Sequence, residues 1–455
     1  MRENQLAEAL HHSFLNSPNY ARLLARTARG AKAELNMAGL TDSAKSLVLT
    51  CLQHEIKRPL FLIVQDNHTA AHYHQELNYL SRYKVLLYPA SEVSPYEQVL
   101  SSPDNVASQM EVLQRLLAQP EEPYVVVVAA RSLMQRVLPS PILKDNMLTF
   151  KVGDSINPEQ LARQLTRLGY TRESLVTLRG EFSVRGDIID IFPSTGLPVR
   201  IELFGEEVES IRMFNIDSQR SVEESEPAVV GPRWWVILES EDEKREALVK
   251  TLRAITDKTI ASLDDTAADT LNSVMENDLT ALLSGGYPES VEYYAPYIHN
   301  GPEGFASLID YIPSHALVAF DEWDSVSQFL TSHEDKLKKA LQEGLETGRL
   351  LPLPRTLHKQ ADEVLTSFKE NQRIFISSLP VFEQEDKDAV VEFAAKPIEK
   401  FANQMNLVVD KIRQWRQEGN RVVISTEQPQ RLMGILREWD CPARYVAGPG
   451  DSTII

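Results

Sequence analysis

The first third of the chain, from about Ser43 to Pro139, alternates apolar runs with stretches whose apolar residues recur at helical spacing. The predicted strands are 59–66, 84–90 and 124–130, with helices between them at 69–80 and 105–117. These strands are uniformly apolar, which is typical of parallel strands covered by helices on both faces. Alternation of strand and helix indicates an α/β fold.

The pattern changes after about Asn146. One short helix is predicted at 158–168. Three short strands follow without helices between them, at 187–192, 199–204 and 208–214. The turn-like sequences PSTGLP and GEE separate these strands. We therefore expect a small α+β domain with an antiparallel meander at 146–232, which interrupts the larger α/β module.

The chain returns to α/β character after residue 233, with strands predicted at 235–240 and 316–320 and helices between 242 and 282. Beyond the linker-like LPLPRT at 351–356, the pattern predicts a further α/β unit. Its elements are a helix at 401–415, a strand at 421–426 and a helix at 432–439. We expect one module in two parts, 1–145 and 233–353, and then an additional α/β domain at 354–455 that is cut short at its C-terminal end.

The composition excludes several classes of function. The 455 residues include 65 acidic and 47 basic ones, which gives a formal net charge of −18. No long run of Lys and Arg offsets this charge, so we expect no strong binding of nucleic-acid phosphates by this chain alone. The two cysteines, Cys51 and Cys441, predict neither a disulfide framework nor a metal site. The sequence has no signal peptide and no apolar stretch of membrane-spanning length, so we expect a cytoplasmic location.

The sequence GLTDSAKS, which begins at Gly39, approaches the phosphate-binding motif GxxxxGK[ST]. Lys45 and Ser46 match the motif, but Ala44 stands where the motif has its second glycine. Asp42 also places a negative charge where a polyphosphate would bind. We predict a vestigial nucleotide site that binds no ATP productively. The alternative is a helix start that never bound phosphate.

Asp321 and Glu322 directly follow the predicted strand 316–320. Phosphate-loop enzymes place carboxylates after such a strand to order Mg²⁺ and polarise water. The simpler alternative is an acidic helix start, which needs no catalysis. Together with Gly39 and Lys45, the two carboxylates indicate an eroded ATP site. We predict no catalytic residue and no cofactor in this chain.

Arg200, Glu202 and Phe204 share one face of the predicted strand 199–204, because alternate residues of a strand point the same way. Arg185 comes shortly before the preceding strand. A sheet face with two arginines and a phenylalanine favours an interface, since these residue types are frequent at binding hot spots. The alternative is that Phe204 caps the small core and the arginines are merely solvated.

The stretch from Gly180 to Ser221 resembles the small domain with which UvrB and the bacterial transcription-repair coupling factors bind UvrA. The resemblance rests on RGDIIDIFPS, PVRIELFGEEVESIR and DSQRS. It extends over about residues 30–330, including SEVSPYE, SLMQRVLP and SLIDYIPSHALVAFDEWD. It implies a degenerate, helicase-like RecA-type module that is interrupted by a UvrA-binding domain.

Within this family, the chain is more similar to the N-terminal part of a coupling factor than to UvrB. UvrB has an intact phosphate loop, an Asp-Glu-x-His motif and a long tyrosine-rich hairpin. This chain instead has DEWD, and YPASEVSPYEQVLSSPDN leaves no room for the hairpin. The resemblance implies a platform that recruits UvrA in nucleotide-excision repair without ATPase activity of its own. The family's UvrA-contacting positions fall on Arg185, Arg200 and Phe204.

The resemblance also implies partners for the full-length protein, in which later domains bind RNA polymerase and double-stranded DNA and carry the ATP-driven translocase. Two alternatives stay open. The chain could be an active, DNA-dependent ATPase of the UvrB type, or it could act mainly by autoinhibition, folding against later domains and hiding the UvrA surface.

Overall fold

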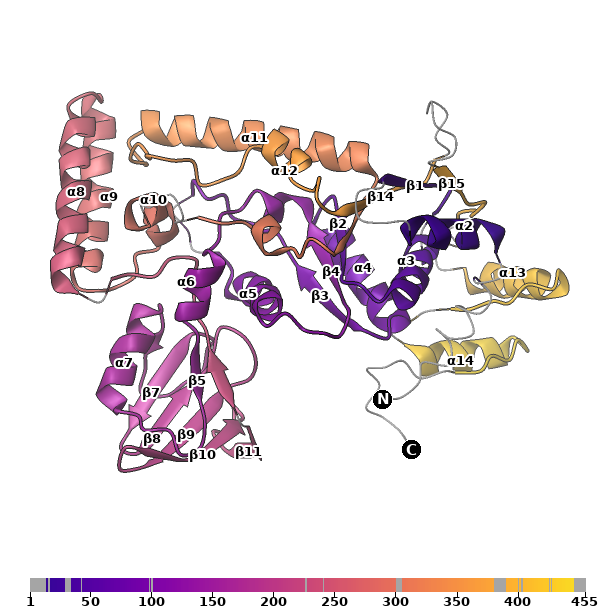
Figure 1. Cartoon of the computed structure of the whole chain (residues 1–455), viewed down its shortest axis with the longest axis horizontal. Coiled ribbons are helices and arrows are strands. Elements are labelled where there is room, and N and C mark those ends of the chain that lie inside the picture. Colours follow the sequence, from indigo (N-terminus) through magenta and orange to yellow (C-terminus); the bar gives the residue numbers. More distant parts are fainter. Residues whose placement is uncertain are drawn as a thin grey trace.

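The computed structural model describes residues 14, 17–28, 34–41, 43–97, 99, 101–225, 227–239, 241–299, 305–379, 390–399, 401, 404–424, 426 and 428–445. Figure 1 shows a central sheet with helices on both sides, a small β-domain below it, a helical hairpin at the far left and two helices at the right. The α/β fold with an interrupting antiparallel domain, predicted from the sequence, is confirmed.

The central sheet is parallel throughout and has the order β15-β1-β14-β13-β2-β4-β3. Its strands are β1 (Glu34–Ala38), β2 (Leu60–Val64), β3 (Lys84–Tyr88), β4 (Tyr124–Ala129), β13 (Leu317–Asp321), β14 (Gln372–Ser377) and β15 (Val390–Glu392). Every residue of β2, β4 and β13 is buried, which explains why these strands read as unbroken apolar runs.

Helices cover both faces of this sheet. One core contains Leu62 and Val127 and is closed by α2 (Pro18–Thr27), α3 (Ser43–Ile56) and α4 (Asn67–Leu80). The other contains Phe61 and Val126. It is closed by α5 (Pro103–Leu117), α6 (Ser140–Asp145), α11 (Trp323–Glu346), α12 (Ala361–Thr366) and the short helices η1 (Ala130–Leu133) and η3 (Leu308–Tyr311). This second core continues into the small domain.

The small domain has a sheet of order β11-β10-β9-β8-β7-β6, antiparallel except for β6–β7. Its strands are β6 (Thr171–Arg172), β7 (Glu181–Arg185), β8 (Ile188–Ile191), β9 (Val199–Phe204), β10 (Glu207–Phe214) and β11 (Ser221–Glu224). The helix α7 (Pro158–Arg167) packs its apolar side on one face. The strands β5 (Leu148–Phe150) and β12 (Ala228–Val230) pair where the chain enters and leaves the domain. The predicted meander is present.

The second part of the module contains more helix than strand. The antiparallel pair α8 (Asp242–Ile260) and α9 (Asp265–Leu283) forms the hairpin at the left of Figure 1. The short η2 (Val291–Tyr294) and α10 (Ala295–Ile298) follow it. The strand predicted at 235–240 is wrong. Trp235–Leu238 is buried, but side chains rather than a strand take its N–H groups, with Leu238 N 3.1 Å from Tyr287 Oη.

Two strands that follow residue 353, where the sequence predicts a domain boundary, join the central sheet. The strand β14 lies between β1 and β13, and Phe375 on β14 stacks on Phe320 with 5.4 Å between the ring centres. The sequence LPLPRT is no free linker, because Leu351 is buried. The central sheet therefore continues through β15. Proline-rich composition was a poor guide here, because Leu351 is buried although Pro352 and Pro354 are exposed.

Beyond β15, α13 (Met405–Gln417) and α14 (Pro429–Glu438) share a small apolar cluster. Residues 420–424 form no strand, so the strand predicted at 421–426 is not present in its described part. Within the described residues, no helix is both long and apolar enough to span a membrane.

Candidate functional site

The small sheet has one apolar and one polar face. The cross-strand register aligns Ser183, Asp190, Arg200 and Arg212 in one row over four neighbouring strands. Residues between these positions, such as Ile201, point into the core beside α7. The polar row therefore lies on the opposite face, where the alternation of β9 predicted it.

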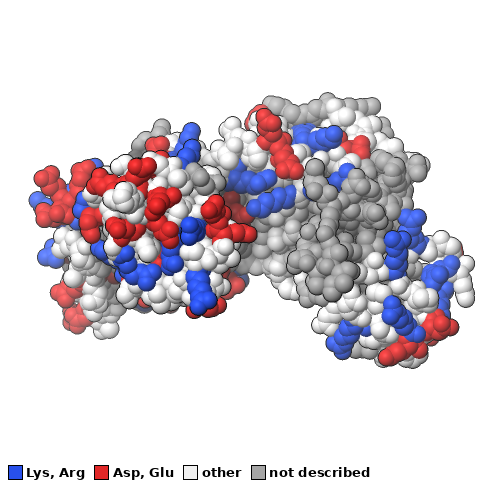
Figure 2. Space-filling view, turned by 90° about the horizontal axis from the view of Figure 1, so that it is seen from below, with Lys and Arg blue, Asp and Glu red and all other residues white. Residues whose placement is uncertain are grey.

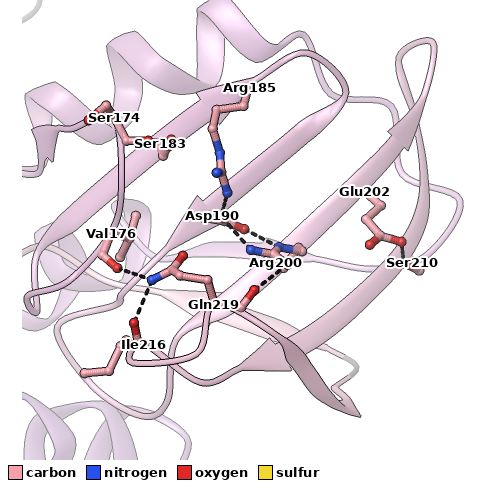
Figure 3. A network of polar contacts seen from close by, with 10 residues as sticks. All are labelled: Ser174, Val176, Ser183, Arg185, Asp190, Arg200, Glu202, Ser210, Ile216 and Gln219. Atoms are coloured by element: carbon pink, nitrogen blue, oxygen red, sulfur yellow. Dashed lines mark hydrogen bonds and ion pairs between the residues drawn. The ribbon is translucent and has the colours of Figure 1, made fainter.

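Asp190 is the centre of this face (Figure 3). Its side chain is fully buried and accepts hydrogen bonds from two arginines. Arg185 donates through Nη2 to Oδ2 at 2.6 Å, and Arg200 donates through Nε to Oδ1 at 2.7 Å and through Nη2 to Oδ2 at 3.0 Å. Charge-assisted bonds of this kind are strong and directional. They hold both predicted arginines in one network.

The two arginines differ in exposure. Arg200 leaves only 12% of its side chain accessible, since Nη1 also donates to the carbonyl of Gln219 at 3.2 Å and the guanidinium lies over the ring of Phe214. Hydrogen bonding to Asp190 raises the pKa of Arg200. Arg185 leaves 45% of its side chain accessible and uses one donor atom on Asp190. Arg185 is therefore free to meet a partner, whereas Arg200 mostly supports the face.

Phe204 lies at the end of β9, and 81% of it is exposed. The alternation of β9 is regular up to this point, because Val199, Ile201 and Leu203 are buried. The alternative in which Phe204 caps the small core is therefore wrong. An exposed ring at this position costs hydration free energy, and in monomers such rings are common at binding surfaces.

The turn beside Phe204 is acidic. Glu206, Glu207 and Glu209 are all exposed there. Seen from below in Figure 2, the left part of the molecule, where the small domain lies, carries mostly acidic side chains with basic ones between them. Glu207 is paired with Phe204 in the strand register, whereas Glu206 accepts from Asn157 at the start of α7. The face thus offers an aromatic ring, an arginine and the neighbouring carboxylate of Glu207.

Sequence reasoning missed three residues of this face. Asp190 and Gln219 complete the network, and Arg212 lies in the same cross-strand row as Arg200. Gln219 has a positive φ of 58° and donates to the carbonyls of Val176 and Ile216, which fixes the loop under Arg200. The acidic residue within the apolar run IIDI was a usable signal for Asp190, because a lone carboxyl in a buried strand requires a counterion.

The predicted vestigial nucleotide site is assembled, but its groups bind one another. Nζ of Lys45 lies 2.6 Å from Oδ1 of Asp321 and 2.8 Å from Oε1 of Glu322. Burial alone would lower the pKa of Lys45, but the carboxylates of Asp321 and Glu322 together outweigh it and raise the pKa. Burial would raise the pKa of Glu322, yet hydrogen bonds from Lys45 and Ser378 lower it. The lysine that would meet a phosphate is therefore neutralised internally.

The rest of the loop is similarly occupied. Oγ of Ser46 donates to Oε2 of Glu76 at 2.6 Å, so this hydroxyl serves a helix contact. Gly39 has a φ of 71°, and a Cβ at this residue would lie 2.0 Å from the carbonyl oxygen of Phe393. The backbone that follows β15 thus crosses directly over the first glycine of the motif. Asp42 lies outside the described residues.

Comparison with known proteins agrees with the sequence resemblance. Residues 148–234 match the family model of the UvrB interaction domain, and residues 397–455 match that of the Rossmann-like domain of cyanobacterial Mfd. The chain is 31% identical over 424 residues to the transcription-repair-coupling factor of Bacillus subtilis, covering 91% of this chain and 35% of that protein. It is 24% identical over 413 residues to the one of Staphylococcus haemolyticus, covering 89% and 34%.

The chain spans about a third of the length of these curated relatives. The similarity covers nearly all of it and includes both the central module and the small domain, whose polar face is described above. The family predicted from the sequence is thereby confirmed: the chain belongs with the transcription-repair-coupling factors and contains a UvrB interaction domain at residues 148–234.

Proposed function

We propose that this chain is a UvrA-recruiting platform of a transcription-repair coupling factor in nucleotide-excision repair, with no ATPase activity of its own. One observation carries the proposal. In a domain that matches the UvrB interaction family, Phe204 is exposed on the same sheet face as a pre-arranged pair of arginines. Arg185 pairs with a carboxylate on UvrA, Phe204 fills a shallow pocket there, and Arg200 keeps the face in shape.

The experiment is equilibrium binding of purified UvrA to this chain, followed by interferometry. Phe204→Ala and Arg185→Ala should each weaken binding at least about 30-fold, because hot-spot truncations cost about 2 kcal/mol or more. Matched controls are Leu178→Ala, which removes another exposed apolar side chain of the small domain, and Arg163→Ala on α7. Unchanged binding by both site variants, at unchanged thermal stability, would refute the proposed face.

The absence of ATPase activity is supported by the internal ion pairs of Lys45 and by the carbonyl of Phe393 over Gly39. The test is ATP hydrolysis by the purified chain, with and without double-stranded DNA. We expect no turnover above the buffer rate. Hydrolysis that disappears in Lys45→Ala would instead establish the alternative function, an ATPase of the UvrB type.

The further partners follow from the family and not from this chain's own contacts. We propose that RNA polymerase and double-stranded DNA bind parts of the longer protein that this chain does not cover, and that the protein acts in the cytoplasm. Copurification of RNA polymerase with this chain alone, at a level comparable to the full-length relative, would contradict that division.

A further inference from the structure

A cavity of about 90 Å³ opens beyond the carboxyl ends of β3 and β4. Its walls come mainly from residues 90–97, 99 and 101, residues 131–136, residues 289–295, α11 and residues 357–358. In α/β proteins this edge of a parallel sheet is the usual place for ligands. The cavity contains none of the residues of the polar face or of the vestigial nucleotide site.

Two arginines line this cavity with unsatisfied donors. Nε of Arg131 and Nε of Arg136 are both buried, and neither has a hydrogen-bond partner within the part of the chain that the structure describes. Buried donors are nearly always satisfied, and a guanidinium has five donors but no acceptor. Arg131 lies over the ring of Phe329 at 5.9 Å, which satisfies none of its donors. Both groups therefore need acceptor oxygens from outside the described chain.

The carboxylates near Arg136 are engaged elsewhere. Asp310 forms an ion pair with Lys359 at 3.6 Å, and Glu363 closes the capping box at the start of α12. Burial lowers the pKa of Arg136, as expected of a cation that lacks a close counterion. The arginine network around Asp190 shows the opposite arrangement, in which a carboxylate meets each guanidinium directly.

Two histidines complete the basic wall. His333 on α11 and His358 both line the cavity. Burial, and then the neighbouring Arg131, lowers the pKa of His333 to about 4. Burial lowers the pKa of His358 as well, and its Nδ1 lies 2.8 Å from Oη of Tyr96. Both imidazoles are therefore held neutral mainly by burial, and the nearby arginines add to this effect.

Glu292 supplies an acceptor on another wall. Its Oε2 accepts from Oγ of Ser101 at 3.1 Å, whereas its Oε1 is buried without a partner among the described residues. Glu97 and Glu289 also line the cavity, but both are exposed and so are solvated. The cavity therefore suits a ligand that has acceptor oxygens for the arginines and a hydrogen to donate to Glu292, which is ionised from about pH 7 upward because burial raises its pKa to about 7.

Phosphate has both kinds of group. Its unprotonated oxygens accept from guanidinium groups, often two at a time, and its remaining hydroxyl donates. An ionised carboxylate has only acceptors. A cavity of this volume holds several water molecules and so accommodates a group of the size of phosphate. We propose that this cavity binds phosphate, with its oxygens on Arg131 and Arg136 and its hydroxyl on Glu292.

The test is calorimetric titration of the whole chain with inorganic phosphate at pH 7, in a buffer free of phosphate and carboxylates. Binding should be saturable, and Arg131→Gln and Arg136→Gln should each weaken it at least tenfold. Arg163→Gln, an exposed arginine on α7, is the matched control and should bind as the parent does. Acetate and AMP are separate arms. Binding of AMP at equal strength would identify a nucleotide phosphate as the source, and binding of acetate alone would overturn the proposal.

Two results would show that phosphate does not bind in this cavity. One is the absence of any heat with phosphate at about 10 mM, and the other is equal binding by the parent and both Gln variants. If a Gln variant does not fold, Arg131→Lys and Arg136→Lys replace it, since lysine keeps the charge but loses the two-point geometry. Phosphate should also raise the melting temperature of the parent but not of these variants. This site is separate from the UvrA face, so either proposal can fail without the other.

Discussion

The carboxylate of Asp190 and the guanidinium of Arg200 form a two-point ion pair inside the small sheet, with 2.7 Å from Nε to Oδ1 and 3.0 Å from Nη2 to Oδ2. Asp190 is fully buried, and Arg185 reaches the same carboxylate from the neighbouring strand. Removing one partner of a buried ion pair leaves a charge without compensation. The pair therefore fixes both the stability and the shape of the face.

Asp190→Asn should destabilise the chain by about 3 kcal/mol, because it leaves the guanidinium of Arg200 without its counterion. It should also weaken UvrA binding, since Arg185 loses the bond that orients it. Urea unfolding measures the first effect and interferometry the second. In an Arg185→Ala background, Asp190→Asn should weaken binding much less. Additive effects of the two substitutions would show that Asp190 does not act through Arg185.

Arg200→Glu and Phe204→Ala should distinguish a residue that stabilises the polar face from one that contacts UvrA. Arg200→Glu places a second carboxylate beside buried Asp190, so we expect a loss of at least about 3 kcal/mol of stability together with a loss of UvrA binding. Phe204→Ala should change stability by less than about 0.5 kcal/mol, because the ring is exposed, yet still weaken binding. Equal melting temperatures for Arg200→Glu and the parent chain would contradict the supporting role of Arg200.

Lys45→Met should destabilise the chain by about 3 kcal/mol, because Asp321 and Glu322 then lie close together without a cation. The triple variant Lys45→Met, Asp321→Asn, Glu322→Gln should recover most of this loss. Lys57→Met, at an exposed lysine after α3, is the control. Unfolding in guanidinium chloride measures the stability of the parent and of the three variants. A neutral effect of Lys45→Met would mean that the ion pairs are not structural.

Glu292 should make the chain less stable at high pH. Burial raises its pKa from 4.5 to about 7, so the folded chain keeps a proton that the unfolded chain has released between these values. The stability associated with this residue is present below pH 4.5 and is lost as the pH rises through 7. In phosphate-free buffer, Glu292→Gln should therefore be more stable than the parent at pH 8, by about 2 kcal/mol, and no more stable at pH 4.5. If the stability of the parent and of Glu292→Gln changes with pH in the same way, the proposed effect of Glu292 is excluded.

Local pattern was sufficient for several elements and for the exposure of one candidate site residue. The strands β2, β4 and β13 are long apolar runs, and the alternation of β9 placed Phe204 outward without any knowledge of its neighbours. Helix α5 likewise follows from its apolar spacing.

Pairings between distant segments could not be predicted in the same way. The register of β8 against β9, which brings Asp190 to Arg200, depends on how the turn between them folds. Lys45 and Asp321 are 276 residues apart and meet only because α3 begins, and β13 ends, at the same edge of the sheet. The strand β14 was missed for a related reason, since its burial depends on β1 and β13 at its two sides.

The backbone of Phe393, which crosses Gly39, limits how a nucleotide site could be engineered or could evolve at this position. Exchanging Ala44 for glycine would complete the consensus letters of the motif, but the carbonyl of Phe393 would still occupy the space above Gly39, and Lys45 would still be bound to two acids. Regaining a nucleotide would require an edge strand to detach from the sheet as well. A nucleotide site that is blocked in this way would not be opened by one or two substitutions, and selection would then act on the surfaces that the scaffold presents.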